Sequence, residues 1–230
     1  MRVDKFGVLD TTRIDETSVG RILSIGQAKF LVLDSGTVDR IETIRRKAQI
    51  ILPKDAASII LSCDIRSGCT VVEGGAGSGA LTIALASFVH PGGKVISYEA
   101  REEFLEIAQD NVEKAGIADV VEFRLDDVTR HLEESTVDAV VLDIPNPWDA
   151  LGGVHRALRP GGHFASYVPT MNQVERTVHE LQKLPFVGIR STETLEREIE
   201  VGEMGTRPSF KMLGHTGYLT FARKVESRFP

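Results

Sequence analysis

From residue 69 onward, short apolar runs alternate with amphipathic segments, and this alternation constrains the fold more than any other feature of the chain. Strand-length apolar runs that are each followed by a helical pattern predict parallel strands, with helices covering both faces of one sheet. Continuous apolar runs are typical of short strands buried on both faces. The successive pairs are CTVVEG with SGALTIALASFV, KVISYE with REEFLEIAQDNVEKAG, VVEFRL with DVTRHLEE, VDAVVLD with WDALGGVHRAL, and GHFASYVP with NQVERTVHELQKL.

The end of the chain departs from this alternation. The segments FVGIRSTETLE and TGYLTFARKV both have strand character, and no good helical pattern lies between them. Two such strands pair most simply as an antiparallel edge. We therefore expect an α/β, Rossmann-like sheet whose last strand is antiparallel.

The first 40 residues follow a different pattern. Short apolar runs separated by Gly, Asp and Ser predict a small antiparallel β unit. Residues 41–62 are predicted to form a helical connector that is interrupted at Pro53, where a helix restarts with proline in its first turn. The expected domains are therefore a small N-terminal β domain at 1–45 and a larger domain at 46–230, with 46–68 as the connector.

Composition excludes several classes of protein. The chain has 230 residues, of which 42% are hydrophobic and 26% charged, as in ordinary globular proteins. No apolar run approaches the roughly 20 residues that span a bilayer, and the first residues lack a signal-peptide core, so we expect a cytoplasmic protein. Two cysteines, Cys63 and Cys69, are too few for a disulfide scaffold and wrongly spaced for zinc. Buried free thiols are expected there, and no metal site is predicted.

Charge is unevenly distributed along the chain. The net charge is −6, yet residues 1–55 hold 10 basic and 8 acidic residues, a local excess of positive charge. The positive charge is concentrated around Arg45, Arg46, Lys47 and Lys54. Either these residues form a solvated helix face, or they contact the phosphates of a nucleic acid.

The first strand-to-helix turn of the sheet is Glu73-Gly74-Gly75-Ala76-Gly77-Ser78-Gly79. Glycines allow close approach of the backbone to a ligand, and the N-terminus of the next helix favours a polar or anionic group. Gly75, Gly77 and Ala80 fit the dinucleotide pattern. Glu73, Gly75, Gly77 and Gly79 also fit E-x-G-x-G-x-G, which resembles the first motif of S-adenosylmethionine-dependent methyltransferases. The turn predicts a nucleoside ligand without identifying it.

Acidic residues end the next two strands. Glu99 lies 20 residues beyond Gly79, where a carboxylate can hold a ribose diol in both NAD enzymes and methyltransferases. The third strand ends in Asp126-Asp127-Val128, and a carboxylate here can accept a hydrogen bond from an adenine amino group. This position is typical of methyltransferases. We predict that Asp127 binds the adenine and that Asp126 faces solvent, although either could instead cap a following helix.

The fourth strand ends in LDIPNPW, which places Asp143 in the crevice where parallel sheets bind ligands. Pro145 and Pro147 stiffen the loop and so hold Asp143 in place. The segment resembles the Asp/Asn-Pro-Pro-aromatic loop of methyltransferases that act on amino or ring nitrogens of nucleic acids. The alternatives are that Asp143 only caps the helix beginning near Trp148, and that Trp148 packs in the core instead of stacking on a base.

Several segments together make the resemblance specific. In order, LPKDA, GGAGSGALT, SYEAREEF, LDIPNPW and RPSFKMLGHTGYLTFARK resemble the tRNA (adenine-N1)-methyltransferase family, in particular its archaeal and bacterial homo-oligomeric members. The resemblance implies a seven-stranded class I methyltransferase sheet, a homotetramer, S-adenosylmethionine as cofactor and tRNA as partner. It also implies methyl transfer to N1 of the T-loop adenine at position 58, with position 57 a second target of archaeal members.

The same resemblance implies roles for individual residues. Glu73, Ala100 and Val128 fall within its cofactor motifs. Asp143 would lie at the methyl group and bind the target adenine, and Tyr167 would help to hold that base. His215 either touches tRNA or stabilises a turn. Leu52 departs from the family, many of whose members carry tyrosine there, so one aromatic wall of the base pocket is either absent or supplied by another residue. The residues expected along the methionine and sulfonium side are Gly75, Ala76, Gly77 and Ser78, with Glu99 at the ribose and Asp127 at the adenine. Gly79 is also expected to bind the cofactor.

Three other functions compete with this prediction. A methyltransferase of the same fold that acts on a small molecule or protein, of the corrin or isoaspartyl type, shares the glycine turn but does not explain DIPNPW. An NAD-dependent oxidoreductase does not explain Asp127 or the antiparallel end. A non-catalytic partner subunit does not explain why the glycine turn, Glu99, Asp127 and Asp143 are all present.

Overall fold

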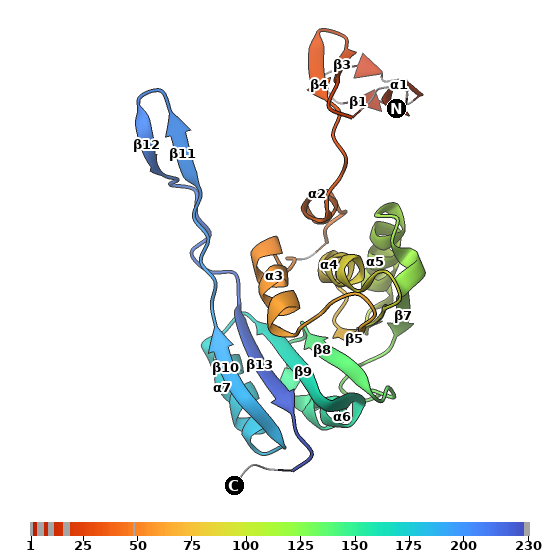
Figure 1. Ribbon diagram of the computed structural model, residues 1–230, viewed down its shortest axis with the longest axis vertical. Coiled ribbons are helices and arrows are strands. Elements are labelled where there is room, and N and C mark those ends of the chain that lie inside the picture. The colour runs from red at the N-terminus through yellow and green to blue at the C-terminus, as the bar shows by residue number, and fades with distance from the viewer. Residues whose placement is uncertain (1, 4–6, 9–11, 16–18, 48, 228–230) are drawn as a thin grey trace. The chain divides into compact units, whose positions relative to one another are not determined.

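The structure of the chain, a computed structural model, describes residues 2–3, 7–8, 12–15, 19–47 and 49–227. The chain divides into two compact units, with the boundary between Arg40 and Ile41 (Figure 1). This boundary lies five residues before the one expected from the sequence.

The first unit contains two antiparallel strand pairs, as the sequence predicts. Strand β1 (Arg2–Val3) pairs with β2 (Gly7–Val8), and β3 (Ile22–Ile25) pairs with β4 (Ala28–Leu31). A four-residue helix, α1 (Thr12–Asp15), lies between the two pairs in sequence. Leu23 and Ile25 alternate with exposed residues along β3 and are buried against Phe30 and Val32.

A seven-stranded sheet forms the centre of the second unit, in the order β10-β13-β9-β8-β5-β6-β7. Neighbouring strands from β7 to β9 are parallel, while β13 is antiparallel to both β9 and β10. The predicted antiparallel last strand is therefore confirmed. The bounds are β5 (Thr70–Gly74), β6 (Lys94–Glu99), β7 (Val121–Leu125), β8 (Val137–Leu142), β9 (Leu158–Val168), β10 (Phe186–Thr192) and β13 (Tyr218–Lys224).

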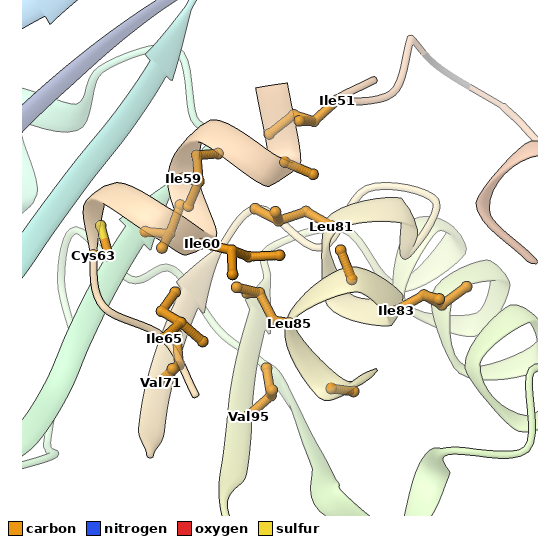
Figure 2. Close-up of a cluster of buried hydrophobic side chains, with 14 of the residues drawn as sticks. Ile51, Ile59, Ile60, Cys63, Ile65, Val71, Leu81, Ile83, Leu85 and Val95 are labelled. Atoms are coloured by element: carbon orange, nitrogen blue, oxygen red, sulfur yellow. The ribbon is translucent and has the colours of Figure 1, made fainter. Parts of the chain in front are cut away.

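Helices cover both faces of this sheet (Figure 1). On one face, α3 (Pro53–Ser62), α4 (Ala80–Val89) and α5 (Glu102–Lys114) enclose an apolar core, shown in Figure 2, in which Ile59, Ile83 and Leu85 are completely buried. On the other face, α6 (Leu151–Ala157) and α7 (Met171–Gln182) pack on a second core that includes Phe164 and Leu181. Cys63 and Cys69 are buried free thiols.

The remaining elements are short. Helix α2 (Thr37–Glu42) follows the first unit, and two 3-10 turns, η1 (Ala118–Val120) and η2 (Pro147–Ala150), precede β7 and α6. A two-stranded hairpin, β11 (Ile199–Gly202) with β12 (Gly205–Pro208), extends from the sheet between β10 and β13 (Figure 1). Among the described residues, no helix has the length and apolar character needed to cross a membrane.

Two local predictions are wrong, and one element was not predicted. DVTRHLEE is a turn followed by irregular chain, because Asp126 and Asp127 hydrogen-bond the backbone just after them, which competes with a helix. The described residues between 43 and 52 are not helical, and the Asn111 side chain hydrogen-bonds the backbone of Arg45 there. The hairpin β11–β12 was not predicted.

Candidate cofactor and substrate site

The topology fixes where a ligand can bind. The chain runs from β5 outward through β6 to β7 and then returns to the other side of β5 to form β8, and this reversal of strand order opens a crevice at the carboxyl ends of the strands. The glycine turn, Glu99, the Asp126–Asp127 pair and Asp143 all lie at these ends, because each directly follows a parallel strand.

The glycine turn is shaped by its neighbours. Gly75 has φ +92° and a Cβ at this position would lie 2.2 Å from the backbone oxygen of Asp143, so only glycine fits. Gly79 has φ +82° and a Cβ there would lie 3.2 Å from the Ala108 backbone on α5. The amides of Gly75 and Ala76 donate to the oxygen of Tyr98 at 2.8 and 3.1 Å. The turn is thus fixed between the ends of β6 and β8.

Glu99 is almost completely buried and connects the turn to the next loop. Its Oε2 accepts a hydrogen bond from the Gly77 amide at 3.0 Å, and its Oε1 accepts from both the backbone and the side chain of Arg101 at 3.1 Å. The carboxylate therefore lies at the crevice in a fixed orientation, as a ribose-binding group requires.

Beside Glu99 is a cavity of about 340 Å³, within the size range of small-molecule sites. Its walls are formed by the chain segments at the carboxyl ends of β6, β7 and β8. Its lining residues are Gly75, Tyr98, Glu99, Ala100, Arg101, Asp126, Asp127, Val128, Thr129, Asp143, Ile144, Pro145 and Asn146.

The two aspartates after β7 are held by local hydrogen bonds. Asp127 Oδ1 accepts from the amide and the hydroxyl of Thr129, at 2.9 and 2.7 Å, and these bonds lower the pKa of Asp127. Asp126 accepts from the Asp127 amide and contacts His131, which lowers the pKa of Asp126. Both are carboxylates at neutral pH, and both line the cavity. Neither caps a helix.

A second, smaller pocket lies on the other side of the glycine turn. Gly75 and Asp143 line both pockets, so they mark the place where the two meet. The remaining lining residues of the smaller pocket are Gln49, Ile50, Ile51, Ala76, Gly77, Ser78, Ala80 and Leu81.

Asp143 is the acidic group at this junction. Its amide donates to the oxygen of Gly74 at 2.8 Å, which continues the β5–β8 pairing by one residue. Burial, reinforced by the nearby Glu99 charge, raises the pKa of Asp143 to about 7. A group with this pKa can exchange between a hydrogen-bond donor and an acceptor near neutral pH.

The loop after Asp143 is fixed by α7 and by its own residues. Gln173, in the first turn of α7, donates from Nε2 to the backbone oxygen of Pro145 at 2.9 Å. Within the described chain, no side chain caps η2, so Asp143 does not serve as a helix cap. Trp148 packs against the second core, and the Arg176 guanidinium lies 4.2 Å from its ring centroid. Trp148 is therefore a packing residue.

Glu73 lies beneath the turn instead of in either pocket. It is completely buried, and its Oε2 accepts hydrogen bonds from Thr82, at 2.6 Å, and from Ser97. Burial raises the pKa of Glu73 to about 8, so the group is mostly protonated at pH 7. The sequence predicts a cofactor contact here, whereas in the structure the Glu73 side chain joins β5, β6 and α4 beneath the turn.

Tyr167, Lys54 and His215 line neither pocket. Tyr167 is buried on β9. The Lys54 ammonium is bonded to Asp55, Thr194 and Thr216, so it has no donor left for the phosphate contact predicted from the sequence. His215 Nε2 contacts the Pro169 oxygen at 2.8 Å and Nδ1 contacts Glu193 at 2.7 Å, and these contacts raise the pKa of His215. Its contacts stabilise a turn.

The other predicted basic residues lie near the smaller pocket. The Arg45 backbone is bonded to Asn111, the Lys47 amide donates to Ser78 Oγ at 3.3 Å, and Arg46 donates to the oxygen of Glu42 at 3.0 Å. The Lys47 ammonium pairs with Glu103. All three side chains are at least partly exposed.

Sequence reasoning missed several lining residues. Arg101 follows Glu99 by two positions, so its position beside the ribose-binding carboxylate was a usable signal. Gln49, Ile50 and Ile51 reach the pocket only because the chain returns to the glycine turn, and no local pattern indicates this. No group of three or more His, Cys, Asp or Glu side chains in the described part of the chain could hold a metal ion.

Comparison with known proteins agrees with this arrangement. Residues 41–207 match the family described as tRNA methyltransferase complex GCD14 subunit. The tRNA (adenine(57)-N(1)/adenine(58)-N(1))-methyltransferase TrmI of Methanocaldococcus jannaschii is 35% identical, over 96% of this chain and 88% of that protein. The tRNA (adenine(58)-N(1))-methyltransferase TrmI of Thermus thermophilus is 37% identical, over 79% and 71%.

Solved structures share the fold over nearly the whole chain. A protein of Thermotoga maritima, described as a SAM-dependent O-methyltransferase, superposes with a TM-score of 0.89 at 36% identity, covering 98% of this chain and 85% of that one. The tRNA (m1A58) methyltransferase TrmI of Aquifex aeolicus gives a TM-score of 0.79 at 29% identity, covering 90% of each chain. The family match and these likenesses together show that the chain belongs to the GCD14/TrmI family of tRNA methyltransferases.

Proposed function

We propose that this protein transfers a methyl group from S-adenosylmethionine to N1 of adenine in the T-loop of tRNA, at position 58 and also at position 57. The observation that carries the proposal is the junction of two pockets at Gly75 and Asp143, in a chain of this family. The relative from Methanocaldococcus jannaschii is described as acting at both positions, and those from Thermus and Aquifex at position 58.

We assign the two pockets to the two halves of the cofactor. In the larger pocket, Glu99 would accept hydrogen bonds from the ribose and Asp127 from the adenine amino group. In the smaller pocket, the turn Gly75–Ser78 and the wall Gln49–Ile51 would hold the methionine half. S-adenosylmethionine, when bound, supplies a methyl group activated by a sulfonium between those halves. Asp143 borders both pockets, so it would lie beside the reacting centre.

Asp143 is proposed to act on the target adenine. Neutral adenine has a free lone pair at N1, so no base is needed to activate it, but the nucleotide must leave its stack to reach the site. An ionised Asp143 would accept a hydrogen bond from the exocyclic amino group and orient N1. As the ring becomes cationic, the same contact stabilises the charge that develops. Tyr167 is proposed to help hold the base.

The RNA backbone is proposed to contact Arg45, Arg46 and Lys47. These residues closely precede the Gln49–Ile51 wall, so phosphates bound there would bring a nucleotide close to Asp143. Arg101 adds positive charge nearby, stacked 3.7 Å from the Phe104 ring centroid. A chain of net charge −6 can bind RNA in this way if positive charge is concentrated at the site.

We also propose that the protein is a homotetramer and that it works in the cytoplasm, where its substrate tRNA is found. The hairpin β11–β12 favours self-association because all its residues are exposed, including Ile199, Val201 and Met204. Isolated two-stranded hairpins are at best marginally stable in water.

The direct test is transfer of labelled methyl groups from S-adenosylmethionine to an unmodified tRNA transcript, followed by nucleoside analysis. N1-methyladenosine is the expected product. Transcripts with uridine at position 58, and at both 57 and 58, assign the modified position. If the protein binds S-adenosylhomocysteine but leaves every transcript unmethylated, the tRNA assignment is wrong and a small-molecule or protein substrate takes its place.

A further inference from the structure

A buried polar network lies at the start of α3, outside both pockets. Asp55 is completely buried, and the Lys54 side chain is 10% exposed. The Lys54 ammonium donates to both Asp55 oxygens at 2.9 Å and to the Thr194 oxygen and Thr216 Oγ1 at 2.8 Å. The Thr216 hydroxyl in turn donates to Asp55 Oδ2 at 2.9 Å. We refer to Lys54, Asp55, Thr194 and Thr216 as the Lys54 network.

The network joins segments that are distant in sequence. It connects the first turn of α3 to the residue two positions after β10 and to the residue two positions before β13. Burying a charged pair is often no more favourable than burying apolar residues of the same volume, so stability alone does not explain it. A fully bonded network does, however, fix the geometry of the segments it joins.

The fixed segment lies against Tyr167. A Cβ added at Gly217 would lie 2.3 Å from Tyr167 Cζ and 2.7 Å from its hydroxyl oxygen, so the phenol packs directly on the Gly217 backbone. Tyr167 is 7% exposed, and its hydroxyl has no hydrogen-bond partner among the described residues. Burial raises the pKa of Tyr167 to about 12, the nearby Thr216 hydroxyl opposes this rise, and the charges of Asp55 and Asp143 add to it. The phenol thus lies between the Lys54 network and the reacting centre.

We propose that Lys54, Asp55 and Thr216 are positioning residues for methyl transfer, which set the orientation of the Tyr167 phenol against Gly217. This inference rests on the proposed function. The three residues touch neither cofactor nor substrate. They act through Tyr167, and their loss should affect the transfer step and spare cofactor binding.

The first test replaces Thr216 by valine, which keeps the shape and removes both hydrogen bonds. Because small displacements of positioning groups can reduce rates by up to about 100-fold, Thr216→Val should lower kcat on tRNA roughly 10- to 100-fold. Its KM for S-adenosylmethionine should stay within about twofold, and Thr216→Ser, which keeps the hydroxyl, should restore most of kcat. Unchanged kcat in Thr216→Val would overturn the proposal.

Thr220→Val is the matched control. Like Thr216, Thr220 is a buried threonine, and its hydroxyl lies 2.9 Å from Ser191 Oγ. Thr220 lies on β13 opposite Ser166, the neighbour of Tyr167 on β9, so its side chain faces the other side of the sheet from Tyr167. It should lower the melting temperature and leave kcat unchanged. An equal kcat loss in both valine variants would indicate general destabilisation and contradict the proposal.

A double-mutant cycle tests whether Tyr167 is the intermediary. In a Tyr167→Phe background, Thr216→Val should cost less than about twofold in kcat, because coupled residues are not additive. If Thr216→Val does not fold, Gly217→Ala replaces it, because the added methyl group displaces the phenol. Gly217→Ala should likewise lower kcat in the wild type and have little effect in the Tyr167→Phe background. Full additivity would overturn the inference. A wild-type protein that methylates no tRNA would instead refute the proposed function, and the inference with it.

Discussion

At the scale of single residues, Asp143 lies at the centre of the site in an environment that disfavours its ionised form. Burial raises its pKa from 3.8 to about 7. Since the folded-state pKa exceeds the unfolded one, stability that is present below pH 3.8 is lost as the pH rises through about 7. The same ionisation produces the hydrogen-bond acceptor that the proposed reaction needs. Activity and stability should therefore change in opposite directions with pH.

This opposition gives a testable result for Asp143→Asn. The variant should lose on the order of 100-fold in kcat, because the charge that stabilises the cationic ring is gone. It should nevertheless melt at a higher temperature than wild type at about pH 8.5, with little difference near pH 4. Wild-type kcat/KM on tRNA should rise between about pH 6 and 8. Exposed Asp119→Asn is the control for a surface charge change, and a lower melting temperature for Asp143→Asn at the alkaline pH would contradict the argument.

The glycine turn offers a matched pair of substitutions. Gly75→Ala places a methyl group 2.2 Å from the Asp143 oxygen, whereas Gly77→Ala places one in open space at φ +54°. Gly77→Ala should therefore cost only the strain of a left-handed residue, about 1–2 kcal/mol. Gly75→Ala should also displace the loop after β8 and abolish cofactor binding. Calorimetric titration with S-adenosylhomocysteine, alongside thermal melting, measures both effects. Equal affinities in the two variants would refute the role assigned to Gly75.

At the scale of elements, Asn111 on α5 joins the two sides of the smaller pocket. Its Nδ2 donates to the oxygens of Arg45 and Ser78 at 2.9 and 2.8 Å, and its Oδ1 accepts from the Arg45 amide at 3.0 Å. Asn111→Leu should destabilise the fold by about 1–3 kcal/mol, because it leaves buried backbone groups unbonded. It should also weaken S-adenosylhomocysteine binding, since the wall Gln49–Ile51 is released from the glycine turn.

Denaturant unfolding and calorimetry measure the two consequences of Asn111→Leu separately. Asn172→Ala, at an exposed position of α7, is the control that should change neither. If Asn111→Leu lowered stability while cofactor affinity stayed at the wild-type value, the link between this side chain and the pocket wall would be refuted.

The sequence predicted the elements whose formation depends on local residue patterns. The strands and most helices follow from apolar periodicity, and the N-terminus of α3 follows from Pro53. The failures at 43–52 and after β7 have tertiary or side-chain causes. In the segment 43–52, the Asn111 side chain binds the Arg45 backbone. After β7, the Asp127 side chain accepts a hydrogen bond from the Thr129 amide, and Glu134 turns inward to accept one from the Tyr98 hydroxyl at 2.8 Å. Nothing within either segment indicates these partners.

The candidate site divides in the same way. Glu99, Asp127 and Asp143 were predicted because each follows a parallel strand, and topology brings strand ends together. Lys54 was predicted as an exposed cation because a sequence shows its charge but not Asp55 and Thr216 folded around it. Glu73 was predicted at the ligand because its spacing fits a motif, whereas Thr82 and Ser97 bind it beneath the turn.

At the scale of the whole molecule, positive charge must be concentrated if an acidic protein is to bind RNA. Replacing Arg45, Arg46 and Lys47 together by alanine should weaken tRNA binding. The slope of log affinity against log salt should fall by up to about 3, because each phosphate that is no longer neutralised removes about one unit. Affinity for S-adenosylhomocysteine should remain. Lys114→Ala and Lys183→Ala, both exposed, are the controls. An unchanged salt slope would exclude these three residues from the RNA interface.

The hairpin β11–β12 supports the proposed self-association of the chain. Val201 and Met204 are 80% and 103% exposed, and beyond the hairpin Phe210 is 81% exposed. Exposed apolar groups gathered in one place usually mark an interaction surface. Within the described part of the chain, each strand of the hairpin also lacks a neighbour on its outer edge, which another chain could pair with.

If the proposed tetramer forms through the hairpin, charging the hairpin should dissociate it. Light scattering of the wild type should give the mass of four chains of 25.2 kDa, and Val201→Lys combined with Met204→Lys should give a smaller species. Cofactor affinity should persist, because the pockets lie within one chain. Affinity for tRNA should fall if basic residues of several subunits share one RNA. Glu203→Lys, at the tip of the same hairpin, adds charge without removing apolar surface and should keep the tetramer. A wild type of 25.2 kDa in solution would refute the tetramer, and the exposed hairpin would then be a surface for another partner.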